Sequence, residues 1–137
     1  MKFLCMGYLD VESWSKKTPV EQSAAIDACF AYDDVLRKEG HFAGGEAIAG
    51  PDKVVTLWKK AGQLLVTDGP YAETKELLGG LLILEARDMK HAVELMSKHP
   101  GIAMGPFEIR PTEDITPMIR ESEKRRAAGA LRRPARA

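Results

Sequence analysis

The sequence has few of the residues on which metal centres and disulfide scaffolds depend. Only two cysteines and three histidines occur in 137 residues. Cys5 and Cys29 lie in apolar periodic segments without a second Cys or His at ligand spacing, and the histidines are scattered. We therefore expect no metal and no other cofactor, and we interpret both cysteines as small buried side chains in a reducing compartment.

Long apolar runs and net charge are also missing. The longest strongly apolar run, residues 77–84, is far shorter than the ~20 residues that span a bilayer, and the apolar start is too short for a secretory signal. We therefore expect a cytoplasmic protein that does not bind a membrane. The 20 acidic residues balance the 20 basic ones, so net charge gives no general reason to expect a nucleic acid as partner.

Charge is nevertheless uneven along the chain. Residues 118–137 hold seven basic and two acidic residues, a formal charge of +5, which leaves −5 on residues 1–117. This segment is rich in Arg and Ala and lacks an apolar stripe, so we expect a mobile tail or docking arm, at most a frayed helix, after a folded domain at 1–117. Without interleaved aromatic residues, the tail is not expected to bind nucleic acid.

The periodicity of the apolar residues predicts an α+β domain. Thr18 and Glu21 form a capping box around Pro19, which predicts the start of a first helix, and Gly40 predicts its end. Asp88 predicts the cap of a second helix. The expected strands are residues 3–8, 41–48, 78–85 and 104–110, with a hairpin over 54–66 around the turn 60–63. This order predicts a ferredoxin-like βαββαβ sheet with both helices on one face and a hairpin inserted midway.

One face of that sheet is then left without helices. Because the strands at 3–8 and 78–85 carry apolar residues on both faces, the second face needs a cover, and a second copy of the sheet is the simplest one. We therefore expect a homodimer. On the first helix, Ile26 and Phe30 fall beside Asp33 and Arg37 on the face away from the expected core, so we interpret them as a subunit or loop contact. We expect His99 to act as a protonated cap at the end of the second helix.

Residues 67–76 form the most informative stretch. Asp68, Gly69 and Pro70 predict a rigid turn at the end of a strand, in which Asp68 either caps the turn or acts as a proton acceptor, since half-burial would raise its pKa. Glu73, Lys75 and Glu76 form a solvated charge cluster, or Lys75 either neutralises an anionic group or pairs with Glu73. Tyr8 is interpreted as a core or interface residue or as a donor to a substrate oxygen.

Three segments resemble the YCII-related family, and specifically its DGPF-motif subgroup: residues 68–76, residues 78–80 and residues 105–111. The resemblance covers about residues 1–111, and Tyr71 stands where the subgroup usually has Phe. It implies a dimeric α+β barrel with the motif beside a crevice near the sheet. Relatives in the wider family resemble lyases or dehalogenating enzymes with a His and Asp pair, the His at the start of the first helix. No His occurs between Pro19 and Gly40, so that pair does not carry over.

Two functions are consistent with these features. The first is a small-molecule site in the dimer crevice with lyase-like acid/base chemistry, in which Asp68 is catalytic and Tyr8, Tyr71, Glu73 and Lys75 bind the substrate. The second is a non-enzymatic binding or regulatory module that acts with an extracytoplasmic-function sigma factor, because homologues of the subgroup are often linked with such factors.

Overall fold

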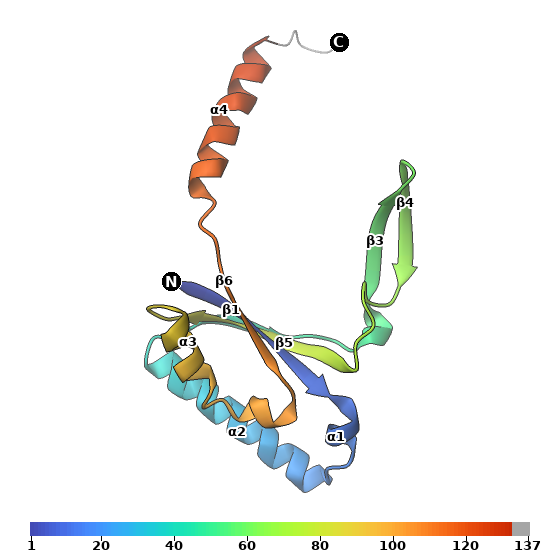
Figure 1. The fold of residues 1–137 in the computed structure, drawn as a ribbon, viewed down its shortest axis with the longest axis vertical. Coiled ribbons are helices and arrows are strands. Elements are labelled where there is room, and N and C mark those ends of the chain that lie inside the picture. Colours follow the sequence, from blue (N-terminus) through green and yellow to red (C-terminus); the bar gives the residue numbers. More distant parts are fainter. Residues whose placement is uncertain (133–137) are drawn as a thin grey trace.

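A four-stranded antiparallel sheet forms the centre of the structure, a computed structural model that describes residues 1–132 (Figure 1). Its strands follow the spatial order β2-β5-β1-β6. They are β1 (Lys2–Asp10), β2 (Phe42–Ala47), β5 (Glu76–Glu85) and β6 (Phe107–Pro111). When the hairpin between β2 and β5 is set aside, the elements alternate as in a ferredoxin-like fold, so the predicted mixed α+β class with an antiparallel sheet is confirmed.

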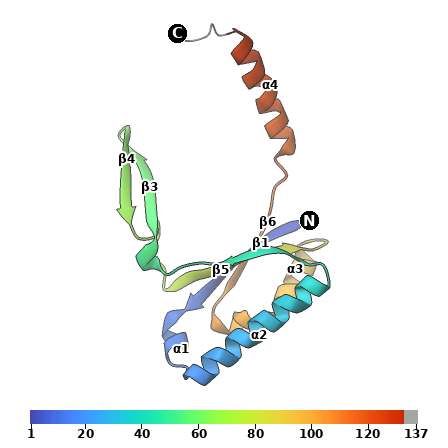
Figure 2. The same cartoon turned by 180° about the vertical axis from the view of Figure 1, so that it is seen from behind.

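Helices cover only one face of this sheet. In both Figure 1 and Figure 2, α2 (Pro19–Lys38) and α3 (Met89–Met96) lie on the same side of the strands. The predicted caps are confirmed: Thr18 accepts a hydrogen bond from the amide of Glu21, and Asp88 accepts one from His91. Gly40 follows α2 with φ of +80°, which suits a glycine at a helix end. The remaining helical turns are α1 (Val11–Ser15), η1 (Pro51–Lys53) and η2 (Pro100–Met104).

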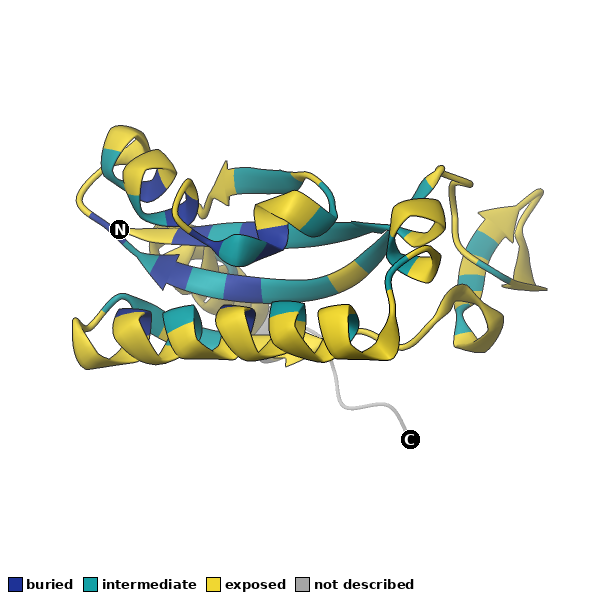
Figure 3. Cartoon of the chain, turned by 90° about the horizontal axis from the view of Figure 1, so that it is seen from below, coloured by how far each residue is buried: buried dark blue, intermediate teal, exposed yellow. Residues whose placement is uncertain are grey.

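The hydrophobic core lies between this helical layer and the sheet. Figure 3 shows the buried residues on the strands and on the helix turns that face them. The largest fully buried side chains are those of Phe3, Cys5, Leu36, Leu84 and Met96. Since alternate strand residues point to opposite faces, Leu4, Met6, Leu81 and Ile83 point away from the helices, and they are only half-buried.

The inserted hairpin forms a two-stranded sheet of its own. Its strands β3 (Val55–Lys60) and β4 (Gln63–Asp68) are joined by Ala61 and Gly62, both with positive φ, as a two-residue hairpin turn requires. The hairpin rises from the sheet on the side that the helices leave bare (Figures 1 and 2).

A terminal helix, α4 (Thr116–Arg132), rises on that same side (Figures 1 and 2). The sequence indicated no more than a frayed helix here, whereas the structure has a regular helix of 17 residues. The last part of the expected basic tail, residues 133–137, lies outside the described residues. Within residues 1–132, no helix is both long and apolar enough to cross a bilayer.

Candidate functional site

A cavity of about 520 Å³ lies between α2 and the sheet. Most of its wall is apolar, and strands β1, β2 and β5 form one side of it. The lining includes Tyr8, Trp14, Ile26, Cys29, Phe30, Asp33, Arg37, Phe42, Glu46, His99, Met104 and Phe107. A cavity of this size and character is typical of sites for small organic ligands.

Glycines explain why the strands leave room here. Gly7, Gly45, Gly79 and Gly80 all line the cavity, and Gly7 pairs directly with Gly80 across β1 and β5. A side chain on Gly80 would meet the carbonyl oxygen of Glu46 at 3.2 Å, so the backbones approach closely at this point. The sheet therefore presents bare backbone where the covered face would otherwise carry side chains.

The opposite wall comes from one stripe of α2. Ile26, Phe30, Asp33 and Arg37 all line the cavity. From the sequence, Ile26 and Phe30 were expected to form a subunit or loop contact, and in the structure both lie on the wall of this cavity. Phe30 keeps 63% of its surface exposed, so the cavity is open to solvent beside it.

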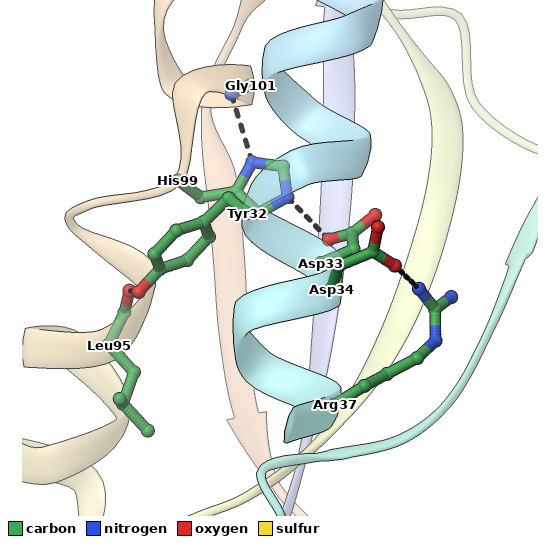
Figure 4. Close-up of polar contacts among 7 residues, drawn as sticks. All are labelled: Tyr32, Asp33, Asp34, Arg37, Leu95, His99 and Gly101. Atoms are coloured by element: carbon green, nitrogen blue, oxygen red, sulfur yellow. Dashed lines mark hydrogen bonds and ion pairs between the residues drawn. The ribbon is translucent and has the colours of Figure 1, made fainter. Parts of the chain in front are cut away.

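Asp33 forms a polar pair with His99 on this wall (Figure 4). The Nε2 atom of His99 lies 2.9 Å from Oδ1 of Asp33, and the two side chains are only 8% and 18% exposed. The amide of Gly101 donates to Nδ1 of His99 at 3.0 Å. Because Nδ1 accepts this bond, the ring proton resides on Nε2, which donates to Asp33.

These hydrogen bonds leave different groups free on the two residues. Both ring nitrogens of His99 are used within the protein, so the imidazole holds the carboxylate in place and has no free lone pair to take a proton. Asp33 uses one carboxylate oxygen for His99, and Oδ2 has no hydrogen-bond partner among the described residues. Asp33 is therefore the group of this pair that can accept a proton from a bound molecule.

Local sequence explains the position of His99. Pro100 begins η2, and Gly101 lets the backbone approach the ring, since a side chain there would lie 2.9 Å from Nδ1. The rings of Tyr32 and Phe107 meet the imidazole edge-on, with centroids at 5.5 and 5.1 Å. The hydroxyl of Tyr32 donates to the carbonyl oxygen of Leu95 and so fixes its ring in turn.

The prediction for His99 was wrong. It was expected as a protonated helix cap, but it is a buried side chain at the start of η2 that bonds across to α2. The family resemblance implied a His at the start of the first helix, whereas in this chain α2 carries the Asp of the pair. In the sequence, the signal for this site was the position of Asp33, a carboxylate that shares one helix face with the apolar residues Ile26 and Phe30.

Arg37 supplies the positive charge of the cavity wall. It lies one turn beyond Asp33, its Nη1 donates to Oδ1 of Asp34 at 2.8 Å, and its guanidinium lies 4.1 Å from the centre of the Phe42 ring. These two contacts hold the guanidinium beside the cavity and leave further N–H donors free of partners among the described residues.

The two thiols of the cavity wall are not nucleophiles. Burial raises the pKa of Cys5 to about 11. Burial, and then the charge of Asp33, raise the pKa of Cys29 above its ordinary value. Both thiols therefore stay protonated near neutral pH. Among residues 1–132, no three His, Cys, Asp or Glu side chains are grouped as metal ligands.

The residues predicted as a site divide into two groups. Tyr8 lines the cavity, and its hydroxyl donates to Oε2 of Glu108 at 3.5 Å. Asp68, Tyr71, Glu73 and Lys75 lie at the base of the hairpin and in the loop after it, and all four are exposed and outside the cavity lining. Asp68 is thus exposed and not half-buried as expected. Tyr71 contacts Trp58, with ring centroids 5.2 Å apart.

Comparison with known proteins identifies the family. The model of the YCII-related domain matches residues 1–116. The chain belongs to the YCII-related family. An uncharacterized protein of Rhizobium meliloti (strain 1021) is 37% identical over 60 residues, which span 41% of this chain and 47% of that protein. The chain therefore spans about half the length of this relative.

A solved structure with partial similarity to the chain has a low TM-score. It is 5-chloro-2-hydroxyhydroquinone dehydrochlorinase from Burkholderia phenoliruptrix AC1100, in complex with 2,5-dihydroxybenzoquinone. Its TM-score with this YCII-related chain is 0.46 at 17% identity, over 82% of this chain and 94% of that one.

Proposed function

We propose that this YCII-related protein binds a small, largely apolar organic molecule in the cavity between α2 and the sheet, and that Asp33 moves a proton to or from it. The observation that carries the proposal is the buried Asp33–His99 pair on the wall of a 520 Å³ cavity. A carboxylate that is fixed by a neutral imidazole and has one oxygen free is suited to general acid/base work.

The surrounding residues suit a lyase-like elimination. Asp33 takes a proton from a carbon or hydroxyl group of the ligand, and the electron pair left behind forms a double bond as the leaving group departs. Arg37 lies one turn away and stabilises the negative charge that develops. Trp14, Phe30 and Phe42 contribute aromatic surface that holds a flat or apolar ligand body.

A matched set of carboxylate variants tests this function. We expect small organic acids, phenols and enols, screened by thermal shift, to include ligands that raise the melting temperature of the wild type but not of Asp33→Asn. Asp68→Asn is the control, because Asp68 is exposed and outside the cavity. Asn at position 33 can still accept the bond from His99, so the fold is retained. Equal stabilisation of wild type and Asp33→Asn by every ligand would contradict the proposal.

The same screen tests the sequence-based prediction of Asp68 as the catalytic residue, with Tyr71, Glu73 and Lys75 as binding residues. If the ligand response is lost in Asp68→Asn and kept in Asp33→Asn, then the loop at residues 68–76 is the site and the cavity is not. The motif in this loop supports our placing the chain in the DGPF-motif subgroup.

We also propose that two copies pair through the bare faces of their sheets, as in a dimeric α+β barrel. Leu4, Met6, Leu81 and Ile83 support this proposal, since they form an apolar strip on the face that no helix covers. No contact within the described residues favours the alternative of a regulatory module acting with a sigma factor.

A further inference from the structure

The hairpin has one face that its own chain leaves open. Strand alternation and the pairing of Leu57 with Val66 place Val55, Leu57, Leu64 and Val66 on the same face, and each keeps more than half of its surface exposed. On the other face, Trp58 contacts Tyr71 and donates to the hydroxyl of Thr67 at 3.0 Å. A two-stranded hairpin is marginally stable in water unless another element packs on it. The open face therefore needs a cover.

The base of α4 carries a matching apolar stripe. Ile115 precedes the helix, and Met118 and Ile119 follow at the spacing that places all three on one side. Their exposed fractions are 48%, 62% and 44%. Large apolar side chains that are exposed together in this way mark interaction surfaces.

The charges of α4 and of the motif loop at the base of the hairpin are opposite, whereas the open hairpin face itself also carries Lys59, which pairs with Leu64. After its apolar stripe, α4 carries Arg120, Lys124, Arg125 and Arg126 against Glu121 and Glu123. At the base of the hairpin, the motif loop carries Asp68, Glu73 and Glu76 against Lys75. The same opposition holds for the whole chain, with +5 on residues 118–137 and −5 on the rest. Electrostatic complementarity thus favours α4 next to this loop.

Within one copy, these two surfaces stand apart. The helix α4 follows the edge strand β6, whereas the hairpin leaves the sheet between β2 and β5 at the other edge, and Figures 1 and 2 show both rising separately from the bare face. The two arms also leave the sheet at opposite strand ends, because Glu76 beside the hairpin pairs with Asp10, whereas Pro111 at the end of β6 pairs with Phe3. If two sheets pair face to face about an axis that runs diagonally across the strands, the corner at which β6 ends in one copy lies over the corner at which β2 ends in the other. Each α4 then lies beside the hairpin of the partner.

We propose that α4 of each copy packs on the β3–β4 hairpin of a second copy, with Met118 and Ile119 against Leu57, Leu64 and Val66, and with the basic side chains of α4 against the motif loop. The partner is a second copy of this chain, and the contact occurs twice in the dimer. This inference rests on the proposed pairing of the bare sheet faces.

Cysteine cross-linking tests the contact directly. Two single variants, Leu57→Cys and Ile119→Cys, are mixed and mildly oxidised, and non-reducing electrophoresis is expected to show a disulfide-linked species of twice the chain mass only in the mixture. Native Cys5 and Cys29 are buried, and each variant alone serves as the control. If the double variant in one chain forms the disulfide within a monomer instead, α4 covers its own hairpin and the proposal is overturned.

A matched pair of lysine variants tests the hairpin face in solution. Leu64→Lys is expected to weaken the dimer, so that sedimentation equilibrium gives a dissociation constant at least tenfold higher. Gln63→Lys adds the same charge to the neighbouring residue on the other face and is expected to leave the constant unchanged. Equal constants for both variants overturn the proposal. A wild-type dimer that forms no cross-link and tolerates Leu64→Lys also overturns the α4 contact while supporting the pairing of the sheets, whereas a monomeric wild type overturns both.

Discussion

The covered half of this protein and its two arms, the hairpin and α4, contain the same types of apolar residue, but these are buried in the first and exposed in the second. Leu84 in β5 is completely buried, and Leu57 in β3 is 66% exposed, although both are leucines in regular antiparallel strands. Helices α2 and α3 cover the first, and no element of the same chain covers the second. Burial, and with it stability, therefore depends on which elements pack together, because strand pairing alone buries no side chain deeply.

The largest expected effect comes from truncating one leucine in each region. Leu84→Ala is expected to lower the free energy of unfolding by about 2–5 kcal/mol, because it leaves a void in the core. Leu57→Ala is expected to change it by less than about 0.5 kcal/mol at protein concentrations where the chain is monomeric, because its side chain is already hydrated. Urea denaturation followed by circular dichroism measures both. Similar losses in the two variants at low concentration would mean that the hairpin is covered within one chain.

The second effect is a dependence of stability on alkaline pH that belongs to the covered half. The pKa of Cys5 is about 11 in the folded protein against 9.0 as the ordinary value, because burial disfavours the thiolate. The folded state therefore holds its proton where the unfolded state has lost it. This contribution to the free energy of unfolding is fully present below pH 9 and is lost as pH rises to 11, by about 3 kcal/mol at most.

Denaturation curves at pH 8, 9.5 and 11 measure this fall. In Cys5→Ala that part of the decline should be absent, whatever the general loss of stability from the smaller side chain. Parallel pH profiles for wild type and Cys5→Ala would show that the thiol does not contribute.

The smallest expected effect is the difference in stability between variants of Asp33 and Asp68. Asp33→Ala leaves the buried Nε2–H of His99 without its acceptor, which is expected to lower the free energy of unfolding by about 1–3 kcal/mol. Asp68→Ala removes an exposed carboxylate and is expected to stay within about 0.5 kcal/mol of the wild type. Chemical denaturation near pH 7 compares them. A larger loss for Asp68→Ala would indicate that the motif loop is structurally the more important of the two.

Local signals in the sequence were sufficient for most elements of the fold. The capping box at Thr18 and the cap at Asp88 begin α2 and α3 as predicted, because a cap depends on residues three positions apart. The turn at Ala61 and Gly62 was predicted for the same reason, since two residues with positive φ close the hairpin.

The site required contacts that no local pattern contains. Asp33 and His99 are separated by 66 positions, and they meet because α2 and η2 lie on the same side of the sheet. From the sequence, the motif at residues 68–76 was the more informative stretch, but informative residues need not line the cavity. Here they lie on an exposed loop.

The sequence by itself determined most of the strands and helices of the domain, their caps and turns, and the surplus of apolar residues on both faces of the central strands, because each of these depends on neighbours in the chain. Only the tertiary structure decided that His99 is buried against Asp33, that four glycines leave a cavity beside them, and that the hairpin and α4 project from the bare face. These features depend on packing between segments far apart in sequence, where burial and hydrogen bonding override the preferences of the individual residues.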